Sequence, residues 1–129
     1  MLLDVSINNY RAKIATICDL RHQLAHHADE PYREIWINCA KGPALSALLN
    51  GAVGFLIYLR ESGDAGFTSR NPDYAGESNA VLEYQLANGQ RDEFPAHWAV
   101  PESAISEALE YFVVHRQPTP FLLWHDDSV

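Results

Sequence analysis

The sequence predicts a single α+β domain, residues 1–129, in which two helices pack against a mainly antiparallel β-sheet. Several short stretches alternate apolar and polar side chains, and two longer stretches repeat apolar side chains every three to four residues. Turns and hairpins separate these stretches without a regular alternation of strand and helix. With 129 residues, 47% hydrophobic and 20% charged, the chain has the size and composition of one globular domain. We therefore expect one compact core.

The N-terminal region predicts a strand followed by a long helix. Residues 3–7 alternate apolar and polar side chains, the pattern of a half-buried strand. Asn8-Asn9 is suited to a turn or a helix cap, and a helix is then predicted as far as about Ala28, before Pro31. The apolar residues at helical spacing are Tyr10, Ile14, Ile17, Cys18, Leu20 and Leu24.

The middle of the chain predicts two more strands. Residues 34–39 are rich in β-branched and aromatic side chains, and residues 54–60 are apolar on both faces, which is typical of a central strand. Residues 44–50 fit either a short helix or a strand, so their structure stays open at this point. A polar loop is expected from Glu61 to Asn79.

The C-terminal half predicts a hairpin, a helix and a last strand. Residues 81–87 and 90–94 form the hairpin, and Asn88-Gly89 suits a type I′ turn because both residues tolerate positive φ. Pro101 fits the first turn of a helix, and residues 121–124 form a short apolar strand. The buried stripe of this helix is predicted to be Ile105, Ala108, Leu109, Phe112 and Val113.

The net charge of −8 is unevenly distributed along the chain. Residues 1–59 contain five acidic and five basic side chains, whereas residues 60–129 contain twelve acidic side chains and four arginines. A negative field of this kind repels nucleic acid and anionic lipid and speeds encounter with a cationic partner. The alternative is that the carboxylates only keep a small domain soluble.

Other features favour a protein that stays in the cytoplasm. The longest apolar run, residues 52–59, is too short to cross a bilayer, and no export signal is recognisable at the N-terminus. Cys18 and Cys39 are expected to be reduced core thiols, because a disulfide framework in a small secreted domain usually has more cysteines. We expect a monomer or a weak homodimer when the protein is free.

No complete active site or cofactor motif is recognisable. His22 and His26 share a helical face, but Gln23 stands where a zinc protease has glutamate, so a solvated helix end is the preferred interpretation. His125-Asp126-Asp127 is expected to be a solvated terminus. Residues 63–69 are rich in glycine but lack the lysine of a phosphate-binding loop. Nucleophile-elbow and zinc-deaminase signatures are also missing.

The segment from Asn88 to Trp98 is the best candidate for a binding surface. A tight turn brings Arg91, Asp92 and Glu93 close to Phe94 and Trp98, which resembles the composition of an interface hot spot. The alternative is a solvated hairpin tip whose two aromatic residues belong to the core.

Four stretches in this order resemble the Imm1 family of bacterial immunity proteins: residues 51–59, 63–72, 88–95 and 124–127. The resemblance covers roughly residues 40–127. It implies a non-catalytic antitoxin that binds the catalytic domain of a cognate toxin, and the toxins paired with this family are often similar to nucleic-acid deaminases. An acidic face fits that implication, because enzymes that act on nucleic acid tend to have cationic grooves.

We therefore predict stoichiometric inhibition of a toxin, with no nucleic acid, membrane or cofactor as partner. The residues predicted to contact the toxin are Asp64, Asp73, Tyr74, Asp92, Glu93 and Trp98. Two alternatives from other classes remain. One is a small metal-dependent hydrolase that uses His22 and His26, or His125 with Asp126. The other is a generic acidic module for protein interaction.

Overall fold

The computed structural model describes residues 2–129, and in this range it contains one large and one small β-sheet with two α-helices. The large sheet is antiparallel in the order β10-β6-β5-β4-β3-β1-β2, with the short β9 paired to β5, and the small sheet is the hairpin β7-β8. The strands are β1 (Leu3–Ile7), β2 (Tyr10–Ile14), β3 (Tyr32–Asn38), β4 (Ala44–Asn50), β5 (Val53–Leu59), β6 (Phe67–Arg70), β7 (Val81–Gln85), β8 (Arg91–Pro95), β9 (Val100–Pro101) and β10 (Leu123–Asp126). The helices are α1 (Ile17–His26), the 3₁₀ helix η1 (Ala96–Trp98) and α2 (Glu102–His115). The predicted α+β class is confirmed.

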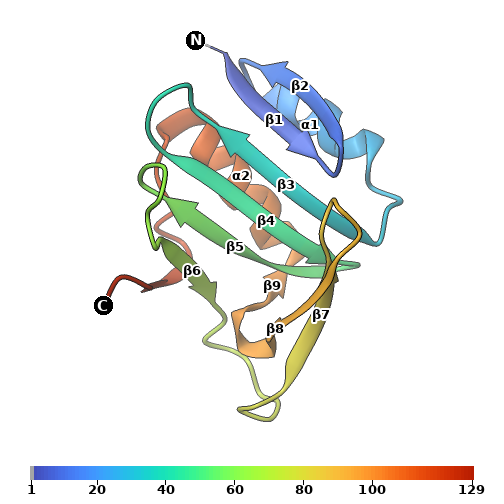
Figure 1. Ribbon diagram of the computed structural model, residues 1–129, viewed down its shortest axis with the longest axis vertical. Coiled ribbons are helices and arrows are strands. Elements are labelled where there is room, and N and C mark those ends of the chain that lie inside the picture. Colours follow the sequence, from blue (N-terminus) through green and yellow to red (C-terminus); the bar gives the residue numbers. More distant parts are fainter. Residues whose placement is uncertain (1) are drawn as a thin grey trace.

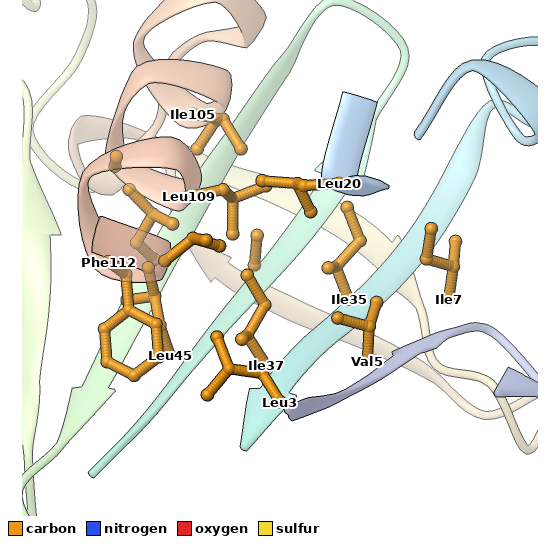
Figure 2. Close-up of a cluster of buried hydrophobic side chains, with 14 of the residues drawn as sticks. Leu3, Val5, Ile7, Leu20, Ile35, Ile37, Leu45, Ile105, Leu109 and Phe112 are labelled. Carbon is orange, nitrogen blue, oxygen red and sulfur yellow. The ribbon is translucent and has the colours of Figure 1, made fainter. Parts of the chain in front are cut away.

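The two α-helices cover one face of the large sheet, the far face in Figure 1, while the β7-β8 hairpin lies against the other. Directly opposed residues of antiparallel strands share a face, so Ile37, Leu45 and Tyr58 form one row beneath the helices. Figure 2 shows Leu109 and Phe112 of α2 and Leu20 of α1 pointing into this layer. The main core therefore lies between the helices and the sheet.

The predicted buried stripe of α2 is confirmed. All five of its residues are buried, and the Phe112 ring lies 6.2 Å from the Tyr58 ring. Pro101 is the N-cap of the helix, and Arg116 ends it in the left-handed conformation with φ 59°.

The N-terminal helix starts later than the sequence pattern predicted. Asn8 takes a positive φ of 54° and, with Asn9, turns the chain into β2, which pairs with β1 from Ile7↔Tyr10 onwards. Helix α1 begins only after Thr16, whose hydroxyl accepts a hydrogen bond from the Asp19 N–H while the Asp19 carboxylate accepts from the Thr16 N–H. The capping box thus fixes the helix start.

Residues 44–50, which fitted helix or strand, form β4 between β3 and β5. β5 lies between β4 and β6, as expected for a strand that is apolar on both faces. The predicted loop from Glu61 to Asn79 was wrong in one part, because residues 67–70 form β6 between β5 and β10. This short strand depends on pairing with both neighbours rather than on its own pattern.

Two turns and the last strand also differ from the prediction. Only Gly89 of the Asn88-Gly89 pair has positive φ, 90°, because the hairpin closes through a bond from the Gly89 N–H to the Leu86 carbonyl and not through a type I′ turn. The last strand is residues 123–126 rather than 121–124, and Phe121 is 82% exposed.

Both cysteines are free thiols, but only Cys39 is partly buried. Cys18 is exposed on α1, so its predicted place in the core was wrong. Burial raises the pKa of the Cys39 thiol, and the nearby Arg116 charge opposes that shift. Neither helix of the described chain is long and apolar enough to cross a membrane.

Candidate functional site

Residues 71–99 form a separate unit on the face of the large sheet that the α-helices leave open. We call this unit the hairpin lobe: the loop 71–80, the β7-β8 hairpin and η1. Phe55 of β5 lies at its centre, with ring centroids 5.2 Å from Tyr84, 4.8 Å from Phe94 and 5.4 Å from Trp98. The lobe therefore has its own small aromatic core.

Hydrogen bonds attach the base of the hairpin lobe to the large sheet. The Ser69 hydroxyl of β6 accepts from the Leu56 N–H at 3.0 Å and donates to the Trp98 carbonyl at 3.0 Å. The Arg70 guanidinium lies over the Trp98 indole, 4.6 Å from the ring centroid. Burial lowers the pKa of Arg70, while the Asp127 carboxylate opposes the shift.

The tip of the hairpin is attached as well. The Ala87 N–H donates to the Glu34 carboxylate at 2.9 Å, and the Asn9 side chain donates to the Ala87 carbonyl at 3.1 Å. The Asn50 side chain donates to the Glu83 carbonyl at 2.9 Å. These contacts come from β3, the β1-β2 turn and β4, so the lobe is held at both ends.

The hairpin lobe contains five carboxylates and one basic residue other than histidine, Arg91, which gives it a formal charge of −4. Arg91 forms an ion pair with Glu83 at 3.1 Å. Within residues 2–129, the four other carboxylates have no ion-pair partner: Asp73, Glu77, Asp92 and Glu93. Half of the net charge of the chain thus lies on this unit.

The other acidic residues of the C-terminal half are more often neutralised. Asp64 pairs with Arg60 at 2.8 Å. Two glutamates of α2 pair with arginines of the electrically neutral N-terminal half: Glu110 with Arg21 at 2.9 Å, and Glu102 with Arg33 at 2.7 Å. The charge asymmetry of the sequence is therefore weaker in space, and the hairpin lobe keeps four of the carboxylates that have no ion-pair partner among the described residues.

Five of the six predicted contact residues lie in the hairpin lobe. Asp73 is exposed in the loop, and Tyr74 is half-buried with its hydroxyl donating to the Glu77 carbonyl at 2.8 Å. Asp92 lies opposite Tyr84, so its side chain is on the side of the hairpin that faces the large sheet. Trp98 is half-buried, and its ring packs between Phe55 and Arg70, so it contributes to the attachment of the lobe.

Glu93 lies directly opposite Glu83 on the outer side of the hairpin. Like charges at directly opposed positions destabilise a strand pair, and Arg91 neutralises only Glu83. A locally unfavourable arrangement of this kind is typical of functional positions.

Asp64 lies outside the hairpin lobe, in the turn between β5 and β6. Its side chain is 7% exposed and accepts hydrogen bonds from the Arg60 side chain at 2.8 and 2.9 Å and from the Arg60 N–H at 2.9 Å. The Arg60 side chain, and then the backbone donors of Arg60 and Gly66, hold the Asp64 pKa far below its usual range. Asp64 is thus engaged within the chain itself.

Sequence reasoning missed two residues of this surface. Glu77 is a fourth lobe carboxylate without an ion-pair partner in the described chain, and a count of the acidic residues in the range 71–99 would have included it. Arg70 positions the Trp98 ring, a contact between different elements that has no local sequence signal.

The structure also describes the groups considered for metal binding and catalysis. His125 lies 3.7 Å from Asp127, while Asp126 accepts hydrogen bonds from Ser128. Within the described chain, no three histidine, cysteine or acidic side chains converge as metal ligands. The Tyr84 hydroxyl is buried under the hairpin and has no hydrogen-bond partner among the described residues, and burial raises its pKa to about 12.

A comparison with protein families matches residues 10–122 to the family described as immunity protein Imm1. The chain belongs to the Imm1 family. The matched region runs from the start of β2 to just before β10 and includes the whole hairpin lobe. Among curated proteins, none matches the sequence at a significant level.

Membership of the Imm1 family confirms the resemblance seen in the sequence and gives the protein its general role. It is an immunity protein, and its partner is a cognate toxin. The hairpin lobe of this Imm1 protein is the candidate surface for that partner, because it combines unpaired carboxylates with a fixed attachment at both ends.

Proposed function

We propose that this Imm1 protein neutralises its toxin without catalysis, by placing the hairpin lobe over the substrate entrance of the toxin's catalytic domain. The proposed toxin acts on nucleic acid and is similar to a deaminase. The complex forms in the cytoplasm, and the immunity protein is a monomer or a weak homodimer when free. No cofactor takes part.

The observation that carries the proposal is the set of unpaired carboxylates on the lobe, Asp73, Glu77, Asp92 and Glu93. An enzyme that binds nucleic acid presents cationic groups to the phosphates, and carboxylates held at a similar surface attract the same groups. Because these carboxylates have no basic partner in the described chain, no internal ion pair has to break before they meet the toxin.

The attachment of the lobe supports the same mechanism. Hydrogen bonds at Ala87 and at Trp98 hold the two ends of the lobe against the sheet. A surface that is ordered before binding loses less conformational entropy in the complex, which favours tight inhibition.

The proposal is tested with two double variants of equal charge. Asp73→Asn with Glu93→Gln removes two exposed carboxylates from the lobe. Glu61→Gln with Glu107→Gln removes two exposed carboxylates from elsewhere that have no ion-pair partner within residues 2–129. At low salt, the lobe variant should associate with the toxin domain roughly tenfold more slowly than the wild type, and the matched variant should stay close to it.

The difference should shrink at high salt, because ions screen exposed charges. Co-expression with the toxin gives a second measurement, in which the lobe variant protects growth less well than the matched variant. Equal association rates for the two double variants would refute a specific role of the lobe. A wild-type rate that does not change with salt would refute the electrostatic mechanism.

A further inference from the structure

A pair of histidines lies on the exposed side of α1, away from the hairpin lobe. His22 and His26 are one helical turn apart, and their Nε2 atoms face each other at 3.2 Å. The rings are close to perpendicular, with centroids 4.6 Å apart and an interplanar angle of 81°. We propose that His22 and His26 form a binding site for one first-row transition-metal dication such as Zn²⁺.

The distance between the two nitrogens fits a shared ion. Zinc binds histidine nitrogen at about 2.0–2.1 Å. An ion at that distance from both Nε2 atoms, which are 3.2 Å apart, makes an N–metal–N angle of roughly 100°, close to the tetrahedral value. In the metal-free protein, one ring donates its N–H to the other. When the proton of the donor ring moves by way of solvent from Nε2 to Nδ1 of the same ring, both Nε2 lone pairs become available to the ion.

The pair is preformed because α1 is fixed independently of any metal. The capping box of Thr16 and Asp19 fixes the start of the helix. Arg21 joins α1 to α2 through two bonds to the Glu110 carboxylate, at 2.9 and 3.0 Å. Binding of the ion therefore does not have to order the helix that carries its ligands.

The chemistry of the site limits which ions it takes. Imidazole nitrogen suits Zn²⁺, Ni²⁺ and Cu²⁺, whereas Mg²⁺ and Ca²⁺ prefer oxygen ligands. No third donor completes a cluster within residues 2–129, so water fills the remaining coordination positions. Both histidines are exposed, so water can reach the ion, and His26 also borders an open cavity of about 450 Å³ with Tyr10, Arg11 and Gln23.

Isothermal titration of the untagged, metal-free chain with Zn²⁺ tests the site. The wild type should bind one ion per chain, and His22→Ala and His26→Ala should each lower the affinity at least tenfold. The matched control is His115→Ala, which removes an exposed histidine at the end of α2 that has no histidine partner in the described chain. Its affinity for Zn²⁺ should stay within twofold of the wild type.

Both histidines of the pair are exposed, so the variants should keep the wild-type far-ultraviolet circular dichroism spectrum and melting temperature. Absence of saturable Zn²⁺ binding to the wild type would overturn the proposal. An equal loss in the His115→Ala variant would overturn it as well. The site is separate from the surface proposed for the toxin, because α1 and the hairpin lobe lie on opposite faces of the sheet (Figure 1).

Discussion

The two faces of the large sheet are covered in different ways. The helix-covered face buries a continuous hydrophobic core that extends from β1 to α2. On the hairpin-covered face, the buried hydrophobic cluster consists of Leu48, Phe55 and Tyr84, and the lobe side chains packed against it, such as Phe94 and Trp98, are half-buried. The free energy that holds the domain together therefore comes mainly from the helix side, because hydrophobic stabilisation scales with the apolar area removed from water.

The charges follow the same division. On the helix side, Glu102 and Glu110 bind arginines from distant parts of the chain. On the lobe, Arg91 neutralises one carboxylate and four remain without a basic partner in the described residues. Two of the three α2 glutamates are thus paired within the chain, while four of the five lobe carboxylates stay available for a second protein.

The largest effect is expected in the helix-side core. Phe112→Ala should lower the free energy of unfolding by about 3–5 kcal/mol, because the ring is fully buried and its loss leaves a cavity. Urea denaturation followed by circular dichroism measures the change. Val114→Ala on the same helix, where the side chain is 56% exposed, should change stability by less than about 0.5 kcal/mol. Equal losses in both variants would contradict the assignment of the main core.

A smaller and more local effect is expected in the hairpin lobe. Phe94→Ala should cost about 1–3 kcal/mol, less than a full core truncation because the ring is half-buried. Hydrogen exchange should speed up in β7 and β8 and remain slow in β3 and β4. Phe121→Ala, at an 82% exposed ring, is the control. Equally faster exchange in all four strands would mean that the helix-covered and hairpin-covered faces unfold as one cooperative unit, and would contradict a separately stabilised lobe.

The local pattern of apolar and polar residues predicted the elements that bury one face in the main core and expose the other. The alternation in β1 and the stripe of α2 are examples, because each has one face in the main core. The prediction failed at the edges of the sheet. In the edge strand β2 only Ile14 is buried, and the helical spacing from Ile14 to Ile17 concealed the strand. β6 spans four residues and is defined by its neighbours.

The candidate site, too, could be predicted from the sequence only in part. The excess of acidic residues could be read from the sequence, but not which carboxylates would meet arginines. Arg21 and Glu110 are 89 positions apart, and only the packing of α1 on α2 brings them together. The resemblance to Imm1 indicated the role of the protein from its motifs, whereas the internal pairing that separates the lobe from the other carboxylates is a property of the tertiary structure.

Substitution of Asp64 is expected to have the smallest effect on stability. Asp64 differs from the lobe carboxylates in being paired with an arginine of its own chain. Its pairing with Arg60 keeps the Asp64 pKa depressed in the folded state, so the carboxylate stabilises the fold above the ordinary aspartate pKa of about 3.9. This contribution is lost as the pH falls below that value. Asp64→Asn should therefore lower the urea midpoint at pH 7, by less than Phe94→Ala does, and the difference from wild type should narrow between pH 4 and pH 2.

The matched control for Asp64→Asn is Asp73→Asn, at an exposed lobe carboxylate without an ion-pair partner in the described chain. It should leave the urea midpoint close to that of the wild type at pH 7, since no internal interaction is removed. In toxin association the opposite order is expected: Asp73→Asn should slow association more than Asp64→Asn does. Asp73 is available to a cationic partner, whereas Asp64 is already bound to Arg60. A loss of stability in Asp73→Asn as large as in Asp64→Asn would show that the lobe carboxylates serve the fold, and the contrast between the two groups of carboxylates would then fail.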